Sequence, residues 1–157
     1  MVYTTQHDGW RENLLTTPAA ITQLLRRVRR VAVLGIRPER LADRPAHYVP
    51  AALIELGLDI VPVPVLDRDI SHILGRPVYR SLAAVPGPID LVDLFRRAED
   101  LPGHLDDLLA ARPGAVWFQS GIINHTVAEQ LARAGIQVVQ DRCLMVDYRR
   151  FKSVGSV

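Results

Sequence analysis

Short apolar stretches alternate with longer amphipathic stretches from residue 31 onward. Five of the short stretches are rich in valine, isoleucine and leucine, and they cover residues 31–35, 58–63, 89–94, 115–118 and 136–140. Such runs are typical of strands that are covered on both faces, as in a parallel sheet. The pattern therefore predicts a sheet of five buried strands.

Around these strands, apolar residues recur at intervals of three and four, as on one face of a helix. Before the first strand, Thr17 is a candidate N-cap and Pro18 suits the first helical position. The apolar positions are Ile21, Leu24, Leu25 and Val28 before the first strand, Val49, Ala52, Leu53 and Leu56 after it, Leu101, Leu105, Leu108 and Leu109 after the third, and Val127, Leu131 and Ala134 after the fourth. Right-handed crossovers would place such helices on both faces of the sheet. The expected fold is α/β: a single doubly wound, Rossmann-like domain with a parallel five-stranded sheet.

Two segments depart from this alternation. Residues 64–88 lack a clear period and have room for one or two short helical turns, for example at 81–85. The end of the chain, from Leu144, predicts a further helix that then frays. We divide the chain into an N-terminal extension with an amphipathic helix (residues 1–30), a Rossmann-like domain (31–148) and a C-terminal tail (149–157).

The composition is that of an ordinary globular chain: 157 residues, 48% of them hydrophobic and 23% charged, fit one domain. The 19 basic and 17 acidic residues leave a net charge of +2, so no nucleic-acid-binding surface is expected. A single cysteine excludes an internal disulfide framework and suits a reducing compartment. Because no apolar run reaches the roughly 18 residues of a membrane span, we expect a cytoplasmic protein without a membrane partner.

In an open parallel sheet, ligands bind beyond the carboxyl ends of the strands. The residues that follow the first strand and that we inspect as candidates are Gly35, Ile36, Arg37, Arg40, Arg44, Pro45, Ala46 and His47. A dinucleotide-binding loop would have Gly-x-Gly-x-x-Gly here, but this loop has no second glycine. Pro45 would begin a helix whose free N–H groups favour an anion, and arginine adds a two-pronged phosphate donor. The arginines are either phosphate ligands or solvated loop residues.

The end of the second strand tests the choice of nucleotide. A dinucleotide-binding fold needs an acidic residue there to accept hydrogen bonds from the adenosine ribose. Here Val63 is followed by Pro64, which has no side-chain acceptor, and Asp67 lies three residues farther on. Arginine in place of glycine suits a ligand with more phosphate, such as one that carries a ribose 3′-phosphate in addition to a pyrophosphate.

The third strand leads into Asp93, Phe95, Arg96 and Arg97. Asp93 is a candidate capping or orienting carboxylate, and Phe95 is suited to cover an apolar arm of a ligand. Arg96 and Arg97 are either phosphate ligands or solvated residues.

The fourth strand leads into Gln119 and Gly121, which would form a polar, flexible rim. Asn124 is a candidate N-cap of the next helix. We expect Trp117 in the core rather than stacked on a ligand.

Catalytic chemistry has weak support in the sequence. His125 follows the rim and is a candidate base, but a histidine one residue past an N-cap is more often a surface residue. Cys143 is either an acceptor of an acyl group or of a thiol in a mixed disulfide, or a half-buried structural thiol. No His, Cys and Asp cluster has metal-ligand spacing, and no serine lies in a nucleophile elbow. We therefore name no catalytic residue and no metal ligand.

Taken together, these segments resemble the small stand-alone CoA-binding proteins of the Rossmann type, which are related to the CoA-binding domain of succinyl-CoA ligase. The resemblance runs over about residues 30–148. It is carried by VAVLGIRPERLADRPAHYV, GLDIVPV, GRPVYRSLAAVPGPIDLVDLFRR, AVWFQSGIIN and AGIQVVQDRC. The family resemblance implies a doubly wound five-stranded sheet that binds coenzyme A (CoA) across the strand ends.

By motif position, the resemblance implies a set of ligand contacts. They are Gly35, Arg37, Arg44, Pro45 and Ala46 around the phosphates, Val63 and Pro64 near the adenosine, and Phe95, Arg96, Gln119 and Gly121 toward the pantetheine. The family usually has asparagine where this chain has Pro64, and a small hydroxyl residue where it has Ala46. Both changes remove a hydrogen-bond partner, so we expect weaker contacts at these two positions.

Three functions stay open at this point. The leading hypothesis is a non-catalytic CoA or acyl-CoA binding module that acts as a sensor or as a partner of another protein. The second is an NAD(P)-dependent enzyme or redox sensor, which the missing glycines and acid disfavour. The third is an interaction protein whose nucleotide pocket is vestigial.

Overall fold

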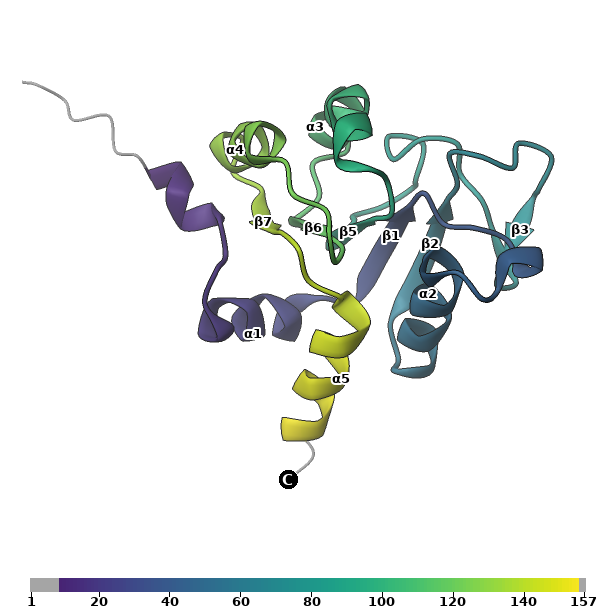
Figure 1. Cartoon of the computed structure of the whole chain (residues 1–157), viewed down its shortest axis with the longest axis horizontal. Coiled ribbons are helices and arrows are strands. Elements are labelled where there is room, and N and C mark those ends of the chain that lie inside the picture. Colours follow the sequence, from purple (N-terminus) through teal and green to yellow (C-terminus); the bar gives the residue numbers. More distant parts are fainter. Residues whose placement is uncertain (1–8, 156–157) are drawn as a thin grey trace, which may run out of the picture.

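The computed structural model of the chain describes residues 9–155. Its main sheet has five parallel strands in the order β2-β1-β5-β6-β7 (Figure 1). The strands are β1 Arg30–Leu34, β2 Asp59–Val63, β5 Leu91–Leu94, β6 Ala115–Phe118 and β7 Gln137–Val139. All five lie within one residue of the predicted apolar runs or inside them. The predicted α/β, Rossmann-like fold is confirmed.

Helices cover both faces of the sheet (Figure 1). Their bounds are α1 Pro18–Arg27, α2 Pro45–Glu55, α3 Leu105–Ala111, α4 His125–Arg133 and α5 Leu144–Val154, with 3-10 helices η1 Gly9–Asn13, η2 Glu39–Leu41 and η3 Ala98–His104. One apolar cluster joins the sheet to α1, α2 and α5, and a second joins it to α3 and α4. The expected helix at the end of the chain is α5, so the boundary at residue 148 falls inside a helix.

The core and the helix caps follow the sequence closely. Trp117 is fully buried, and its Nε1 donates to the carbonyl of Arg142 at 2.7 Å, which confirms its place in the core. The hydroxyl of Thr17 accepts from the N–H of Ala20 at 3.2 Å, and the side chain of Asn124 accepts from the N–H of Val127 at 3.1 Å. Both predicted N-caps are therefore present.

The segment before α1 is attached to the edge of the sheet. Leu14 forms a parallel bridge with Val138 of β7, and the N–H of Leu15 donates to the carbonyl of Val138 at 2.8 Å. The ring of Trp10 lies between the guanidinium groups of Arg11 and Arg133, at 4.5 and 4.6 Å from its centroid. Because this segment pairs with the edge strand, it covers backbone groups that would otherwise be open to other chains.

The irregular segment between β2 and β5 contains a hairpin that the sequence did not predict. Strands β3 His72–Ile73 and β4 Arg76–Pro77 pair antiparallel, joined by Leu74 and Gly75 with φ of 53° and 73°. Two positive φ values are typical of a two-residue hairpin turn, in which Asn-Gly is the usual pair. Leucine at the first position conceals the turn in the sequence. Where a helical turn was expected, at 81–85, the structure has a hydrogen-bonded turn without helix, closed by the Val85 N–H and the Leu82 carbonyl at 3.1 Å.

Within residues 9–155, no helix is long and apolar enough to cross a membrane.

Candidate functional site

A cleft of about 710 Å³ opens beyond the carboxyl ends of the strands. Strand order reverses between β1 and β5: the chain goes from β1 to β2 on one side of this pair, and from β5 to β6 and β7 on the other. Ligands of doubly wound folds bind at such a switch point. The cleft is lined by Gly35, Arg37, Arg44, Pro45, Ala46, Tyr48, Val49, Val65, Leu66, Phe95, Arg96, Arg97, Ala98, Glu99, Gln119, Ser120, Gly121, Ile122, Cys143 and Met145.

Gly35 forms the floor of the cleft between β1 and β5. Its φ is +90°, and a Cβ atom added there would lie 2.4 Å from the carbonyl oxygen of Phe95. The N–H of Phe95 donates to the Leu34 carbonyl at 2.9 Å, so the two strand ends are tied together at this point. Glycine is thus required both by the backbone conformation and by the close approach of the neighbouring chain.

The loop after Gly35 is fastened to α2 by an effect of Pro50. Proline has no N–H, so Pro50 leaves the carbonyl of Ala46, four residues earlier, without its helical partner. That carbonyl accepts from the N–H of Arg37 at 3.1 Å, and the carbonyl of Arg37 accepts from Nδ1 of the buried His47 at 2.9 Å. A proline inside a helix and a buried histidine therefore fix the loop at the helix N-terminus, a role that sequence reasoning missed.

The arginines of this loop differ in their partners. Nε of Arg37 donates to Asp67 at 3.0 Å, and Arg40 pairs with the other oxygen of the same carboxylate. The side chain of Asp67 is only 5% exposed, so it is an ion-pair partner rather than a ribose acceptor open to the cleft. Arg44 is exposed at the N-cap of α2, and its side chain makes no hydrogen bond or ion pair with any other described residue. Its charge is available to a ligand.

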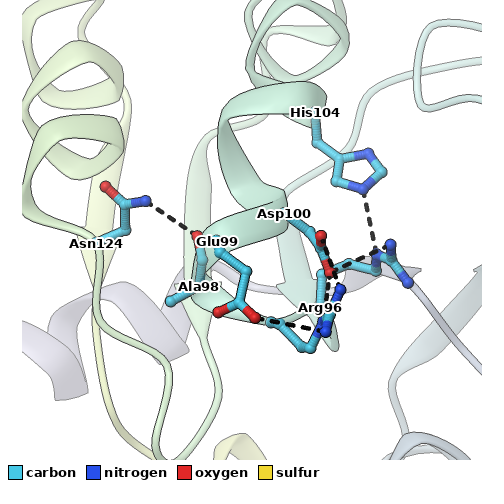
Figure 2. Close-up of polar contacts among 7 residues, drawn as sticks. Arg96, Ala98, Glu99, Asp100, His104 and Asn124 are labelled. Atoms are coloured by element: carbon cyan, nitrogen blue, oxygen red, sulfur yellow. Dashed lines mark hydrogen bonds and ion pairs between the residues drawn. The ribbon is translucent and has the colours of Figure 1, made fainter.

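Arg96 connects the cleft wall to His104 and Asp100 of η3 (Figure 2). Its Nε donates to Nε2 of His104 at 3.2 Å, and a terminal nitrogen lies 3.5 Å from the carboxylate of Asp100. Burial and the neighbouring Arg96 charge lower the pKa of His104, so the imidazole is neutral and accepts this hydrogen bond. Arg96 is therefore held in place at the cleft wall before any ligand arrives.

The next residues hold the same loop against α4 (Figure 2). Arg97 donates from Nε to Asp100 at 2.9 Å and lies 3.4 Å from Glu99, and its hydrogen bond is the main cause that lowers the pKa of Asp100. The amide of Asn124 donates to the carbonyl of Ala98 at 3.0 Å. One side chain thus caps α4 and fixes the cleft wall.

A buried carboxyl lies under the cleft. Asp93 in β5 is 0% exposed, and its Oδ1 accepts from Nε2 of Gln119 at 2.6 Å. Burial raises the pKa of Asp93 to about 8, an effect that the hydrogen bond from Gln119 reduces only in part. Gln119 lines the cleft, so its side chain connects the buried carboxyl of Asp93 to the cleft surface.

The structure brings most of the predicted site residues together. Those that line the cleft are Gly35, Arg37, Arg44, Pro45, Ala46, Phe95, Arg96, Gln119 and Gly121. Ile36 and Val63 are 0% exposed and belong to the core, so their side chains do not reach the cleft. Pro64 lines a neighbouring cavity of about 480 Å³ together with Arg68 and Arg80.

Other cleft residues were missed or left open by sequence reasoning. Tyr48 and Leu66 are large apolar residues that are 43% and 48% exposed in the structure, a feature that sequence alone does not show. Cys143 is half-buried, lies at the N-cap of α5 and lines the cleft, and it also packs against the core. His125 is exposed and does not line the cleft.

Comparison with known proteins decides the family. A family model described as a CoA binding domain matches residues 29–149. The chain belongs to this CoA-binding domain family. The matched residues include all five strands and every residue that lines the cleft. They nearly coincide with the segment on which the resemblance was based.

Relatives support membership of the CoA-binding domain family. YneT of Bacillus subtilis (strain 168) is 37% identical over 130 residues, which cover 82% of this chain and 91% of that protein. The structure titled cell-free ID.343 from Thermus thermophilus is 38% identical, with a TM-score of 0.78 over 87% of this chain and 99% of that one. A hypothetical protein from Pyrococcus horikoshii OT3 is 28% identical, with a TM-score of 0.77 over 87% of this chain and 93% of that one. The family occurs as small stand-alone proteins of similar length.

Proposed function

We propose that this protein binds CoA or an acyl-CoA in the cleft beyond β1 and β5, and that it acts as a binding module rather than as an enzyme. The observation that carries the proposal is the cleft at the switch point between β1 and β5, where Gly35, the N-terminus of α2 and Arg44 converge. Membership of the CoA-binding domain family supports CoA as the ligand class.

The nucleotide end of CoA fits the α2 side of the cleft. In the first turn of α2, Pro45 has no N–H and the N–H of His47 donates to the Arg44 carbonyl at 2.9 Å, so the Ala46 N–H is the backbone donor left for a ligand. The helix dipole also favours an anion at this end. Arg44 supplies a positive charge that no described residue neutralises. We assign phosphate binding to this corner, with Arg37 in a lesser role because it already pairs with Asp67.

The other end of the cleft suits an extended arm with amide groups. Phe95, Ile122 and Met145 provide apolar surface, and Gln119 provides a polar group in the floor. Pantetheine has this mixed character, since its amides are separated by short aliphatic segments. We place the pantetheine there, with its thiol or acyl end nearest to the Cys143 side.

An NAD(P)-binding function has less support. The end of β2 offers the buried Pro64, and the nearest acid, Asp67, is occupied by two arginines. A ribose would find no free carboxylate at that position. The proposal also includes a cytoplasmic location and a protein partner that responds to the CoA-bound state. We assign no residue to that partner.

A panel of ligands tests the proposal by thermal unfolding. The protein, freed of bound ligand by denaturation and refolding, is heated with CoA, acetyl-CoA, dephospho-CoA and NAD at equal concentrations. A ligand at a hundred times its Kd adds about 2.7 kcal/mol of stability, which raises the Tm by several degrees. We expect CoA to raise the Tm most, dephospho-CoA less and NAD not at all. If NAD raises it more than CoA does, the proposal is wrong.

The Arg44→Ala variant tests the phosphate assignment in the same assay. We expect it to weaken CoA binding by about 1.5–3 kcal/mol, the range for a hydrogen bond to a charged group. Arg149→Ala is the matched control, because Arg149 is an exposed arginine of α5 that does not line the cleft. If the two variants bind CoA with equal affinity, Arg44 does not contribute to the site.

A further inference from the structure

Asp93 occupies a position that normally requires an apolar residue. It lies in the middle of the sheet, where its register partners are Val33 of β1 and Trp117 of β6, both fully buried. Its Oδ2 is buried and has no hydrogen-bond partner among the described residues. A carboxyl group without a cation is costly to bury, so its presence at this position suggests a role beyond packing.

The partner of Asp93 is the Gln119 side chain, which extends toward the cleft. Nε2 of Gln119 donates to Asp93 at 2.6 Å. The amide oxygen, Oε1, has no hydrogen bond within residues 9–155, yet it is not among the fully buried unpartnered atoms. It is therefore accessible, and the space that Gln119 lines is the cleft.

We propose that Asp93 is a positioning residue: it holds Gln119 with Nε2 toward the sheet and Oε1 toward the cleft, so that this point accepts an N–H group of the ligand. The inference rests on the proposed function, and it assigns to Gln119 an amide N–H of the pantetheine arm. Two hydrogen bonds would then run in series, from the ligand N–H to Gln119 and from Gln119 to Asp93. Each of them polarises the other, so we call this series a relay.

The relay depends on the charge of Asp93. A carboxylate only accepts hydrogen bonds, so it fixes the orientation of the Gln119 amide, whereas a protonated carboxyl can also donate to Oε1 and leave the amide free to turn. The pKa of Asp93 is about 8, so the carboxylate, and with it the tighter binding, prevails only above that pH.

Other titratable groups face the same side of the sheet or the cleft, and a comparison of an Asp93 variant with wild type at each pH cancels their effect. The buried or half-buried ones include His47 in α2, Cys143 at the N-cap of α5, and Arg142, Asp147 and Tyr148 in and before α5. The charged residues that line the cleft are Arg37, Arg44, Arg96, Arg97 and Glu99. His47 is bonded to the Arg37 carbonyl and Asp147 to Arg142. Burial raises the pKa of Asp93, the hydrogen bond from Gln119 opposes this effect, and no charged side chain contributes.

Calorimetric titration of CoA at about pH 6.5 and about pH 9.5, on either side of the pKa of about 8, tests the proposal. The Asp93→Asn variant keeps the shape of the side chain but cannot become an acceptor-only group. We expect it to bind CoA as wild type does at the lower pH and about five- to tenfold more weakly at the higher pH, the value of one hydrogen bond. The variant/wild-type ratio of Kd cancels the ionisation of CoA itself.

Asp90→Asn is the matched control. Asp90 precedes β5 at the opposite end of the strand, where its carboxylate accepts from the backbone N–H groups of Arg29 and Arg30 at 2.9 and 2.8 Å. Its Kd ratio to wild type should be one at both pH values. A ratio for Asp93→Asn that is the same at both pH values, or a pH profile shared with Asp90→Asn, overturns the inference. If the wild type binds CoA at neither pH, the proposed function is wrong as well.

Discussion

At the scale of single residues, the cleft depends on a few groups in unusual positions. Gly35 combines a positive φ with a neighbouring carbonyl oxygen that leaves no space for a Cβ atom. Asp93 lies beneath the same floor and is bonded to Gln119, which lines the cleft. These positions show how close the backbones of β1 and β5 come where the ligand is expected to bind.

Gly35→Ala should destabilise the protein by about 2–4 kcal/mol, because the strained φ alone costs about 1–3 kcal/mol and the Cβ would overlap the Phe95 carbonyl. Urea unfolding measures the change. Gly121→Ala is the control, since Gly121 also has a positive φ, +82°, but no atom lies within 4 Å of an added Cβ. We expect Gly121→Ala to show only the cost of the φ angle. Equal losses in both variants would mean that the close approach at Gly35 contributes nothing.

At the scale of elements, helix termini and loops are fastened by side chains that each have two functions. Pro50 and His47 of α2 hold the loop after β1, and Asn124 at the start of α4 holds the loop after β5. The cleft is therefore built from helix N-termini and the strand ends that face them. Its two walls are ordered before a ligand binds.

Asn124→Ala should lower the free energy of unfolding by about 1–2 kcal/mol, because it removes an N-cap and the hydrogen bond to the Ala98 carbonyl. Asn124→Ser separates the two effects, since serine retains the cap but cannot donate across to Ala98. We expect the serine variant to keep most of the stability but to bind CoA more weakly, as measured by urea unfolding and calorimetric titration. Full affinity in the serine variant would contradict a role for this contact in the cleft wall.

At the scale of the whole molecule, the pKa of Asp93 makes global stability depend on pH. The folded state keeps its proton up to about pH 8, whereas the unfolded carboxyl loses it near 3.8. The unfolded state therefore binds fewer protons between these values, and the contribution of Asp93 to stability falls as pH rises through this window. His104 acts in the opposite direction, because its pKa is lowered in the folded state.

The difference in unfolding free energy between wild type and Asp93→Asn isolates this contribution. We expect the variant to be similar to wild type near pH 4 and more stable by several kcal/mol near pH 8, at about 1.4 kcal/mol per pKa unit. Urea unfolding across this range measures it, with Asp90→Asn as a control that should lack the trend. A difference that is constant with pH would show that Asp93 is ionised in the folded protein throughout.

The sequence alone determined the fold and the position of the cleft. Apolar runs such as 115–118 and helix signals such as Thr17-Pro18 are local, because each follows from the periodicity or the capping preference of neighbouring residues. Parallel strands linked by helices bring their carboxyl ends to one edge, so Gly35, Arg44, Phe95 and Gln119 could be expected together. The family resemblance then gave the ligand class.

Only the tertiary structure decided which groups are free and which are occupied. Asp67 pairs with both Arg37 and Arg40 across 27 or more residues of sequence, and the side chain of Arg44 remains available. Ile36 and Val63 have their side chains in the core, and Asp93 has Gln119 as its partner, 26 residues away. Charge pairing, burial and pKa depend on which residues meet in space, and periodicity along the chain carries no information about contacts between distant side chains.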